Sequence, residues 1–179
     1  IKRQTMNNKV IINILRFVGL VLLQILVIDN IRFGRYIHPY VYVLFVMLLP
    51  TKMSDSLVMT IGFFTGLVID IFAGTPGLNA AATTFSAFVR PFVIKTMFVG
   101  DDIKNIGEPS PFEMGRGRFT IYMLILLLAH NFVLFLLEAF SFRLFGIILI
   151  QILLGVTTSA VFITIITSVF TTRRRNILK

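Results

Sequence analysis

Six runs of apolar residues, separated by short polar or turn-forming stretches, take up most of this chain of 179 residues. A helix needs about 20 residues to cross the roughly 30 Å hydrocarbon core of a bilayer. The second run is bracketed by Pro39 and Pro50 and is short, so it is either a span or a tilted, half-buried helix. The sequence therefore predicts an all-α polytopic membrane protein with about six transmembrane helices. The runs cover residues 10–28, 36–49, 55–73, 77–98, 119–139 and 144–170.

The composition excludes an ordinary soluble domain. Apolar residues make up 56% of the chain and charged residues 14%, against about 45–50% and about 25% in soluble proteins. The absence of cysteine excludes disulfides, thiolate metal sites and cysteine nucleophiles. A net charge of +9 would suggest nucleic acid in a soluble protein. Here the basic residues lie between apolar runs, so we expect anionic lipid headgroups and no nucleic acid as partners.

The positions of lysine and arginine predict the topology. If six spans leave both termini in the cytoplasm, twelve of the 17 basic residues fall in cytoplasmic segments and three in external ones. The remaining two, Arg16 and Arg90, lie within spans. Cytoplasmic loops carry an excess of Lys and Arg, so this distribution predicts cytoplasmic termini.

The segments outside the spans are short, so the chain is predicted to be one transmembrane domain over residues 1–179. Residues 99–118 form a cytoplasmic loop, and 171–179 form a basic cytoplasmic tail. We expect Arg173, Arg174 and Arg175 to anchor this tail at anionic headgroups or to make cytoplasmic contacts. Tyr42 is predicted to belong to an outer interfacial aromatic belt and Tyr122 to an inner one.

Asp70 is the acidic residue that lies well within a predicted span, where a charge costs about 2.5–3.5 kcal/mol at the helix centre. Arg90 lies about 20 Å down the next span, too far away to pair with it. The turn at residues 74–77 brings the start of the next helix beside Asp70. We therefore expect Asp70 to accept hydrogen bonds from the amides of residues 78–80. Contact with a partner protein, or ion or proton traffic, is the alternative.

Four further polar residues lie within the predicted spans: Arg16, Arg90, His130 and Asn131. The two arginines share a sign and a predicted depth, so we expect both to extend to the inner headgroups. The alternative is that an acidic group of a partner, or a lipid phosphate, lies between them. Asn131 is expected to bond across to another helix, and His130 to be an interhelical donor rather than a metal ligand or proton carrier.

Small residues predict where helices approach closely. Gly62 and Gly66 lie four residues apart on the third predicted span, on a face that admits another backbone. We interpret this face as internal packing, with a homodimer contact as the alternative.

Motifs of catalysis are missing from the sequence. It has no glycine-rich phosphate loop, no serine–histidine–acid set at a common depth and no cluster of carboxylates. His38 and His130 are predicted at different depths, so they cannot share a metal ion. We therefore expect no enzymatic activity, no metal and no cofactor.

One segment carries a family resemblance. Residues 66–80 read Gly-Leu-Val-Ile-Asp-Ile-Phe-Ala-Gly-Thr-Pro-Gly-Leu-Asn-Ala. This stretch resembles the signature of the MreD family, small inner-membrane proteins of the bacterial rod-shape machinery. Many members carry one more residue between the proline and the glycine, so the turn here is one residue tighter. The positions that match the family pattern are Gly66, Asp70, Pro76, Gly77, Asn79 and Ala80.

The resemblance implies a role without chemistry, in the bacterial cytoplasmic membrane. MreD-like proteins bind the bitopic protein MreC and belong to the cell-elongation complex with MreB filaments, the polymerase RodA and a penicillin-binding transpeptidase. The implied function is a scaffold that supports peptidoglycan synthesis and cell shape.

The family is also thought to share the six-helix architecture of the substrate-binding subunits of energy-coupling-factor vitamin transporters. Such a subunit is the alternative function. Its typical Ala-x-x-x-Ala docking face is missing from the first predicted helix, and the outer loops are too short to enclose a ligand.

Overall fold

The computed structural model describes residues 2–31, 38–98, 106–139 and 145–177. Only the backbone is described for residues 2–9, 139, 145, 147 and 170–177. Over these ranges the chain is helical, without a β-strand. The elements are α1 (Lys2–Leu23), its π-helical continuation η1 (Gln24–Ile28), α2 (Val43–Met47), α3 (Asp55–Ala73), α4 (Leu78–Met97), α6 (Arg116–Ala139) and α7 (Phe145–Ile177).

Four of these helices are long and apolar enough to cross a membrane, which gives the chain the make-up of a multi-pass membrane protein. The apolar stretches lie at Val10–Ile28, Asp55–Ala73, Arg116–Glu138 and Ile148–Val169. They correspond to the first, third, fifth and sixth predicted spans. Of the predicted tail at 171–179, residues 171–177 continue the helix α7, which ends at Ile177. Its last turns contain no glycine or proline that would end the helix.

The fourth predicted span corresponds to α4, which runs without a break through Pro91. This helix is less apolar than the four stretches given above and is not among the membrane-spanning candidates. It packs between α3 and α6, which cover both of its sides.

The prediction of a transmembrane helix at 36–49 is wrong for the described part of that run. Only Val43–Met47 is helical, and the backbone on either side is irregular. Proline at positions 39 and 50 limits the helix at both ends, since proline lacks the amide that a helix interior needs. All residues from Val41 to Met47 are buried, so an apolar run that resembled a lipid-facing span is part of the protein core.

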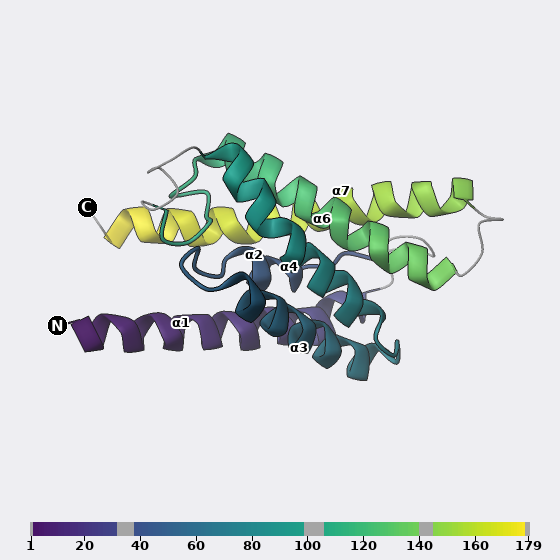
Figure 1. The fold of residues 1–179 in the computed structure, drawn as a ribbon, viewed down its shortest axis with the longest axis horizontal. Coiled ribbons are helices and arrows are strands. Elements are labelled where there is room, and N and C mark those ends of the chain that lie inside the picture. Colours follow the sequence, from purple (N-terminus) through teal and green to yellow (C-terminus); the bar gives the residue numbers. More distant parts are fainter. Residues whose placement is uncertain (1, 32–37, 99–105, 140–144, 178–179) are drawn as a thin grey trace.

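The elements are arranged as passes between two sides of the molecule (Figure 1). Both termini lie on one side, here called the terminus side, together with the end of α4 and the start of α6. The end of α1, the α3–α4 turn and the end of α6 lie on the opposite side, here called the turn side. The short helix α2 lies in the middle and makes contacts with α1, α3, α4 and α6.

Candidate functional site

The carboxylate of Asp70 joins the end of α3 to the start of α4. Its Oδ1 and Oδ2 accept hydrogen bonds from the backbone amides of Asn79 and Ala80, each at 2.9 Å. The Thr75 hydroxyl at 2.8 Å and the Asn79 side-chain amide at 3.0 Å also donate to Oδ1. The predicted contact is confirmed for the amides of Asn79 and Ala80, and Leu78 does not take part. A carboxylate is favoured here because the first amides of a helix lack partners and carry the positive end of its dipole.

The glycines of α3 let α4 approach closely. A Cβ atom added to Gly66 would lie 2.4 Å from the carbonyl oxygen of Asn79 and 2.6 Å from Cα of Ala80. One added to Gly62 would lie 3.2 Å from Cβ of Ala87. This face is therefore used for packing within the chain, as the sequence suggested, and α4 covers it.

The turn between these helices depends on backbone conformation. Gly74 ends α3 with φ of 69°, and Gly77 precedes α4 with φ of 82°. Side chains with a Cβ atom rarely adopt such angles, so glycine suits both positions. Between them, Pro76 makes the turn compact enough for α4 to begin within reach of Asp70.

Tyr42 connects this corner to α6. Its side chain is fully buried, and its hydroxyl lies 3.0 Å from Oδ1 of Asn79 and 3.2 Å from Oγ1 of Thr83. The same hydroxyl lies 2.8 Å from Nε2 of His130. Because Asn79 also donates to Asp70, a chain of buried polar groups extends from α3 through α4 and Tyr42 to α6. His130 is thus bonded to a residue of another segment, and its predicted role as the donor to a neighbouring helix stays a prediction, because the tautomer decides which group donates and Tyr42 is the N-cap residue of α2. The placement of Tyr42 in an interfacial belt is wrong.

The prediction for Asn131 is wrong. Its side-chain amide donates to the carbonyl of Leu127, one turn earlier in α6, at 2.8 Å. Its Oδ1 and the Nδ1 of His130 are buried and have no hydrogen-bond partner among the described residues. A Cβ atom on Gly155 would lie 2.4 Å from that Oδ1, so Asn131 contacts α7 through packing.

The irregular backbone before α2 is bonded by side chains of neighbouring elements. Gln24 in η1 donates to the carbonyl of Pro39 at 3.0 Å and accepts from the amide of Val41 at 2.8 Å. Ser159 of α7 accepts from the amide of Tyr40 at 2.7 Å. These bonds replace the ones that a continuous helix would make internally.

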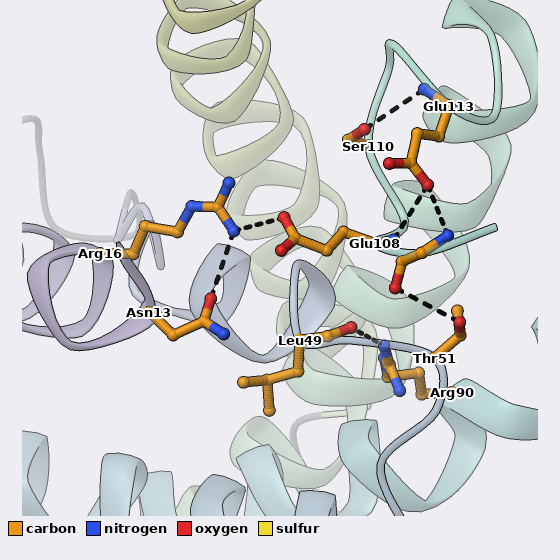
Figure 2. Close-up of polar contacts among 9 residues, drawn as sticks. Asn13, Arg16, Leu49, Thr51, Arg90, Glu108, Ser110 and Glu113 are labelled. Carbon is orange, nitrogen blue, oxygen red and sulfur yellow. Dashed lines mark hydrogen bonds and ion pairs between the residues drawn. The ribbon is translucent and has the colours of Figure 1, made fainter. Parts of the chain in front are cut away.

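The backbone at the other end of α2 is bonded in the same way. The guanidinium of Arg90, 2% exposed, donates to the carbonyl of Leu49 (Figure 2). It also donates to the hydroxyl of Tyr122 at 3.2 Å. That hydroxyl donates to the carbonyl of Met47 at 2.9 Å. Arg90 thus does not extend to the headgroups as predicted, because the end of α2 offers it carbonyl acceptors inside the protein. A cation is favoured beside the C-terminal carbonyls of a helix.

These contacts explain how a broken segment can lie inside the bundle. In the hydrocarbon region, irregular backbone is tolerated only where it is buried in protein and its polar groups are bonded. Gln24, Ser159, Arg90 and Tyr122 come from four different elements and supply those bonds at both ends of α2.

Arg16 has a partner in its own chain. Its NH1 lies 2.7 Å from Oε2 of Glu108, in the connection between α4 and α6, and 3.3 Å from Oδ1 of Asn13 (Figure 2). The side chain of Arg16 is 30% exposed. Arg16 thus has an ion-pair partner within the chain that the sequence did not predict, and its contact with lipid headgroups stays a prediction.

The connection that carries Glu108 is ordered by its own hydrogen bonds. Glu113 accepts from the amides of Gly107 at 2.6 Å and of Glu108 at 3.0 Å. The amide of Thr51 donates to the carbonyl of Gly107 at 3.1 Å, which ties the start of the α2–α3 turn to the same connection (Figure 2). Of the predicted loop at 99–118, residues 99–105 lie outside the described residues, and α6 already begins at Arg116.

Three predicted contact residues, Arg173, Arg174 and Arg175, lie on the last turns of α7, and their side chains are outside the described residues. Among the described residues, no three His, Asp or Glu side chains form a group that could hold a metal ion.

Sequence reasoning missed the roles of Tyr122, Ser159 and Glu108. The available signal was the pair of prolines around the second run. A run too short to span, with proline at both ends, requires donors and acceptors from other helices. Searching the other spans for buried polar side chains would then have identified Gln24 and Arg90 as partners of α2.

No protein-family model, no curated protein and no solved structure matches the chain.

Proposed function

We propose that this chain is a non-enzymatic membrane scaffold of the MreD type in the bacterial inner membrane. It binds the single span of an MreC-like bitopic partner and works with the cell-elongation complex of MreB, RodA and a penicillin-binding transpeptidase. The observation that carries the proposal is the corner between α3 and α4. Within the motif residues 66–80, the carboxylate of Asp70 and the close contact at Gly66 both fix the position of α4 relative to α3.

The hydrogen bonds of the buried polar side chains support the proposal of a scaffold. The buried side chains of Asp70, Tyr42, Arg90 and Gln24 are engaged by backbone groups and by other buried side chains. In a substrate site, polar groups converge on a pocket where a ligand can reach them. Here they hold the helices together, which suits a protein whose function is to present rigid helix faces.

The proposal includes six membrane crossings, with both termini in the cytoplasm. The irregular segment around α2 is the second crossing, and α4 is the fourth. Two features support this: both ends of the described chain lie on one side of the bundle (Figure 1), and ten of the 17 basic residues belong to described segments that lead to that side. The α4–α6 connection then faces the cytoplasmic filament. Arg173, Arg174 and Arg175 lie at the inner headgroups.

The topology can be tested by cysteine labelling, because the chain contains no cysteine. Lys52→Cys introduces a thiol in the α2–α3 turn, and Ala73→Cys introduces one at the end of α3; both positions are exposed. In spheroplasts, a membrane-impermeant maleimide should label Ala73→Cys and should label Lys52→Cys only after permeabilisation. The reverse pattern would contradict cytoplasmic termini.

The function is tested by co-purification. A tagged chain expressed with an MreC-like bitopic protein should recover that protein from detergent-solubilised membranes, and a variant of the partner with a scrambled transmembrane span should not be recovered. Recovery of ATPase subunits and a vitamin-sized molecule in place of the bitopic protein would identify a transporter subunit and overturn the proposal.

A further inference from the structure

An apolar groove with a volume of about 600 Å³ lies between α1 and α3. Its walls are residues 10–17 of α1 and 61–68 of α3, and its floor includes Phe45 and Leu49 of the α2 segment. The volume is in the range of about 300–1,000 Å³ typical of small-ligand sites. Ile14 of one wall and Phe64 of the other are 55% and 58% exposed, so the groove is open along its side.

The length of the groove limits what it can hold. Eight helical residues on each wall extend about 12 Å, less than half of the roughly 30 Å hydrocarbon core. Towards the turn side the groove is closed, because Leu20 and Gln24 are buried against the α2 segment. A transmembrane helix needs a contact surface over the whole bilayer, whereas an acyl chain occupies one leaflet. The groove therefore fits a lipid of the leaflet on the terminus side.

The rim of the groove is polar and basic. Asn13 lines the groove and holds the guanidinium of Arg16 through Oδ1 at 3.3 Å. The bonds of Arg16 to described residues, Asn13 and Glu108, use NH1 alone. Its Nε and NH2 donors therefore remain available among the described residues. A guanidinium presents its donors in a planar fork that matches the oxygens of a phosphate.

We propose that this groove binds an anionic phospholipid. One acyl chain lies between α1 and α3, and the phosphate contacts Arg16 and Asn13. Glu108 competes with the phosphate for the same guanidinium, so the ion pair between Arg16 and Glu108 limits lipid affinity. This proposal does not depend on the identity of the bitopic partner.

The test uses the absence of tryptophan from the chain. Phe64→Trp places a single fluorophore in the groove wall, and Phe72→Trp places one at the other end of α3, where the side chain is 66% exposed and outside the groove. Each variant is reconstituted in phosphatidylcholine nanodiscs with a low fraction of lipid that carries brominated acyl chains. Brominated phosphatidylglycerol should quench the Phe64→Trp reporter with about fivefold higher apparent affinity than brominated phosphatidylcholine. The Phe72→Trp reporter should show no preference.

Variants of Arg16 and Glu108 then test whether the rim of the groove causes the preference for phosphatidylglycerol. In the Phe64→Trp background, Arg16→Gln should abolish the fivefold preference, Arg16→Lys should keep part of it and Glu108→Gln should increase it. Equal quenching by the two lipids, or a preference that survives Arg16→Gln, would overturn the proposal. If only the Phe72→Trp reporter is quenched, then protein covers the groove, either a second copy of the chain or a partner helix. This outcome would also overturn the proposal.

Discussion

The hydroxyl of Tyr42 lies 2.8 Å from Nε2 of His130 and joins the segment of the short helix α2 to α6 in the middle of the bundle. Tyr42 precedes α2, which has five residues and is too short to cross a membrane. Its position therefore depends on hydrogen bonds to the longer helices around it.

Tyr42→Phe should destabilise the fold, because the substitution removes a hydroxyl with three buried partners and leaves the volume unchanged. We expect a loss of about 1–3 kcal/mol in the free energy of unfolding, measured by denaturation in detergent. Tyr40→Phe is the matched control, because the Tyr40 hydroxyl makes no hydrogen bond to a described residue, and it should change stability little. Equal effects of the two substitutions would contradict the assigned network.

Asp70→Leu should reduce the amount of folded protein in the membrane far more than Asp70→Asn. Leucine leaves the amides of Asn79 and Ala80 unpaired at about 1–3 kcal/mol each, whereas asparagine keeps one acceptor oxygen. Membrane accumulation and thermal unfolding of the purified variants measure the difference. Asp55→Leu, at an exposed position in the first turn of α3, serves as the control and should accumulate normally. Equal accumulation of both Asp70 variants would count against the carboxylate's role.

Arg90→Met should lower the stability by about 1–3 kcal/mol, because the carbonyl of Leu49 and the hydroxyl of Tyr122 lose a buried partner. Arg90→Lys should restore only part of this loss, since a single ammonium group does not reproduce the planar guanidinium fork. Lys95→Met, at an exposed position one turn later, should leave the unfolding midpoint unchanged. Full restoration by lysine would favour a headgroup anchor, where only the charge matters.

Gly66→Ala should separate α3 from α4, because the new methyl group would lie within 2.6 Å of the backbone of Ala80. The expected cost is about 1–3 kcal/mol, measured as a lower unfolding midpoint. Gly19→Ala is the matched control, because nothing lies within 4 Å of its added Cβ atom. Alanine there should be neutral or stabilise α1 by up to about 1 kcal/mol. Similar effects of the two substitutions would show that α4 does not pack as closely as described.

Much of the local structure near Asp70 follows from the sequence. A carboxylate near the end of one apolar run, followed by a glycine–proline turn, leaves the first amides of the next helix as its nearest donors. The observed bonds to Asn79 and Ala80 agree with that reasoning. Such a prediction succeeds because all of its groups lie within ten residues, so chain connectivity alone brings them together.

Local sequence was a poor guide to Arg16, Arg90 and Asn131. Apart from the contact of Arg16 with Asn13, the partners of the two arginines come from distant segments: Glu108 for Arg16, and Leu49 and Tyr122 for Arg90. Depth along a helix, which the sequence supplies, does not tell which side of that helix faces protein. An arginine at the same depth extends to headgroups on one side and bonds to buried carbonyls on the other.

The sequence by itself determined the class of this protein and the positions of its long apolar stretches, because hydrophobic length acts locally along the chain. Only the tertiary structure decided the role of the short run around α2. A run of apolar residues is compatible with lipid on the outside of a bundle or with protein at its centre. The choice depends on whether other helices offer donors and acceptors for its irregular backbone. Gln24, Ser159, Arg90 and Tyr122 provide them, and so the second run lies buried in the core.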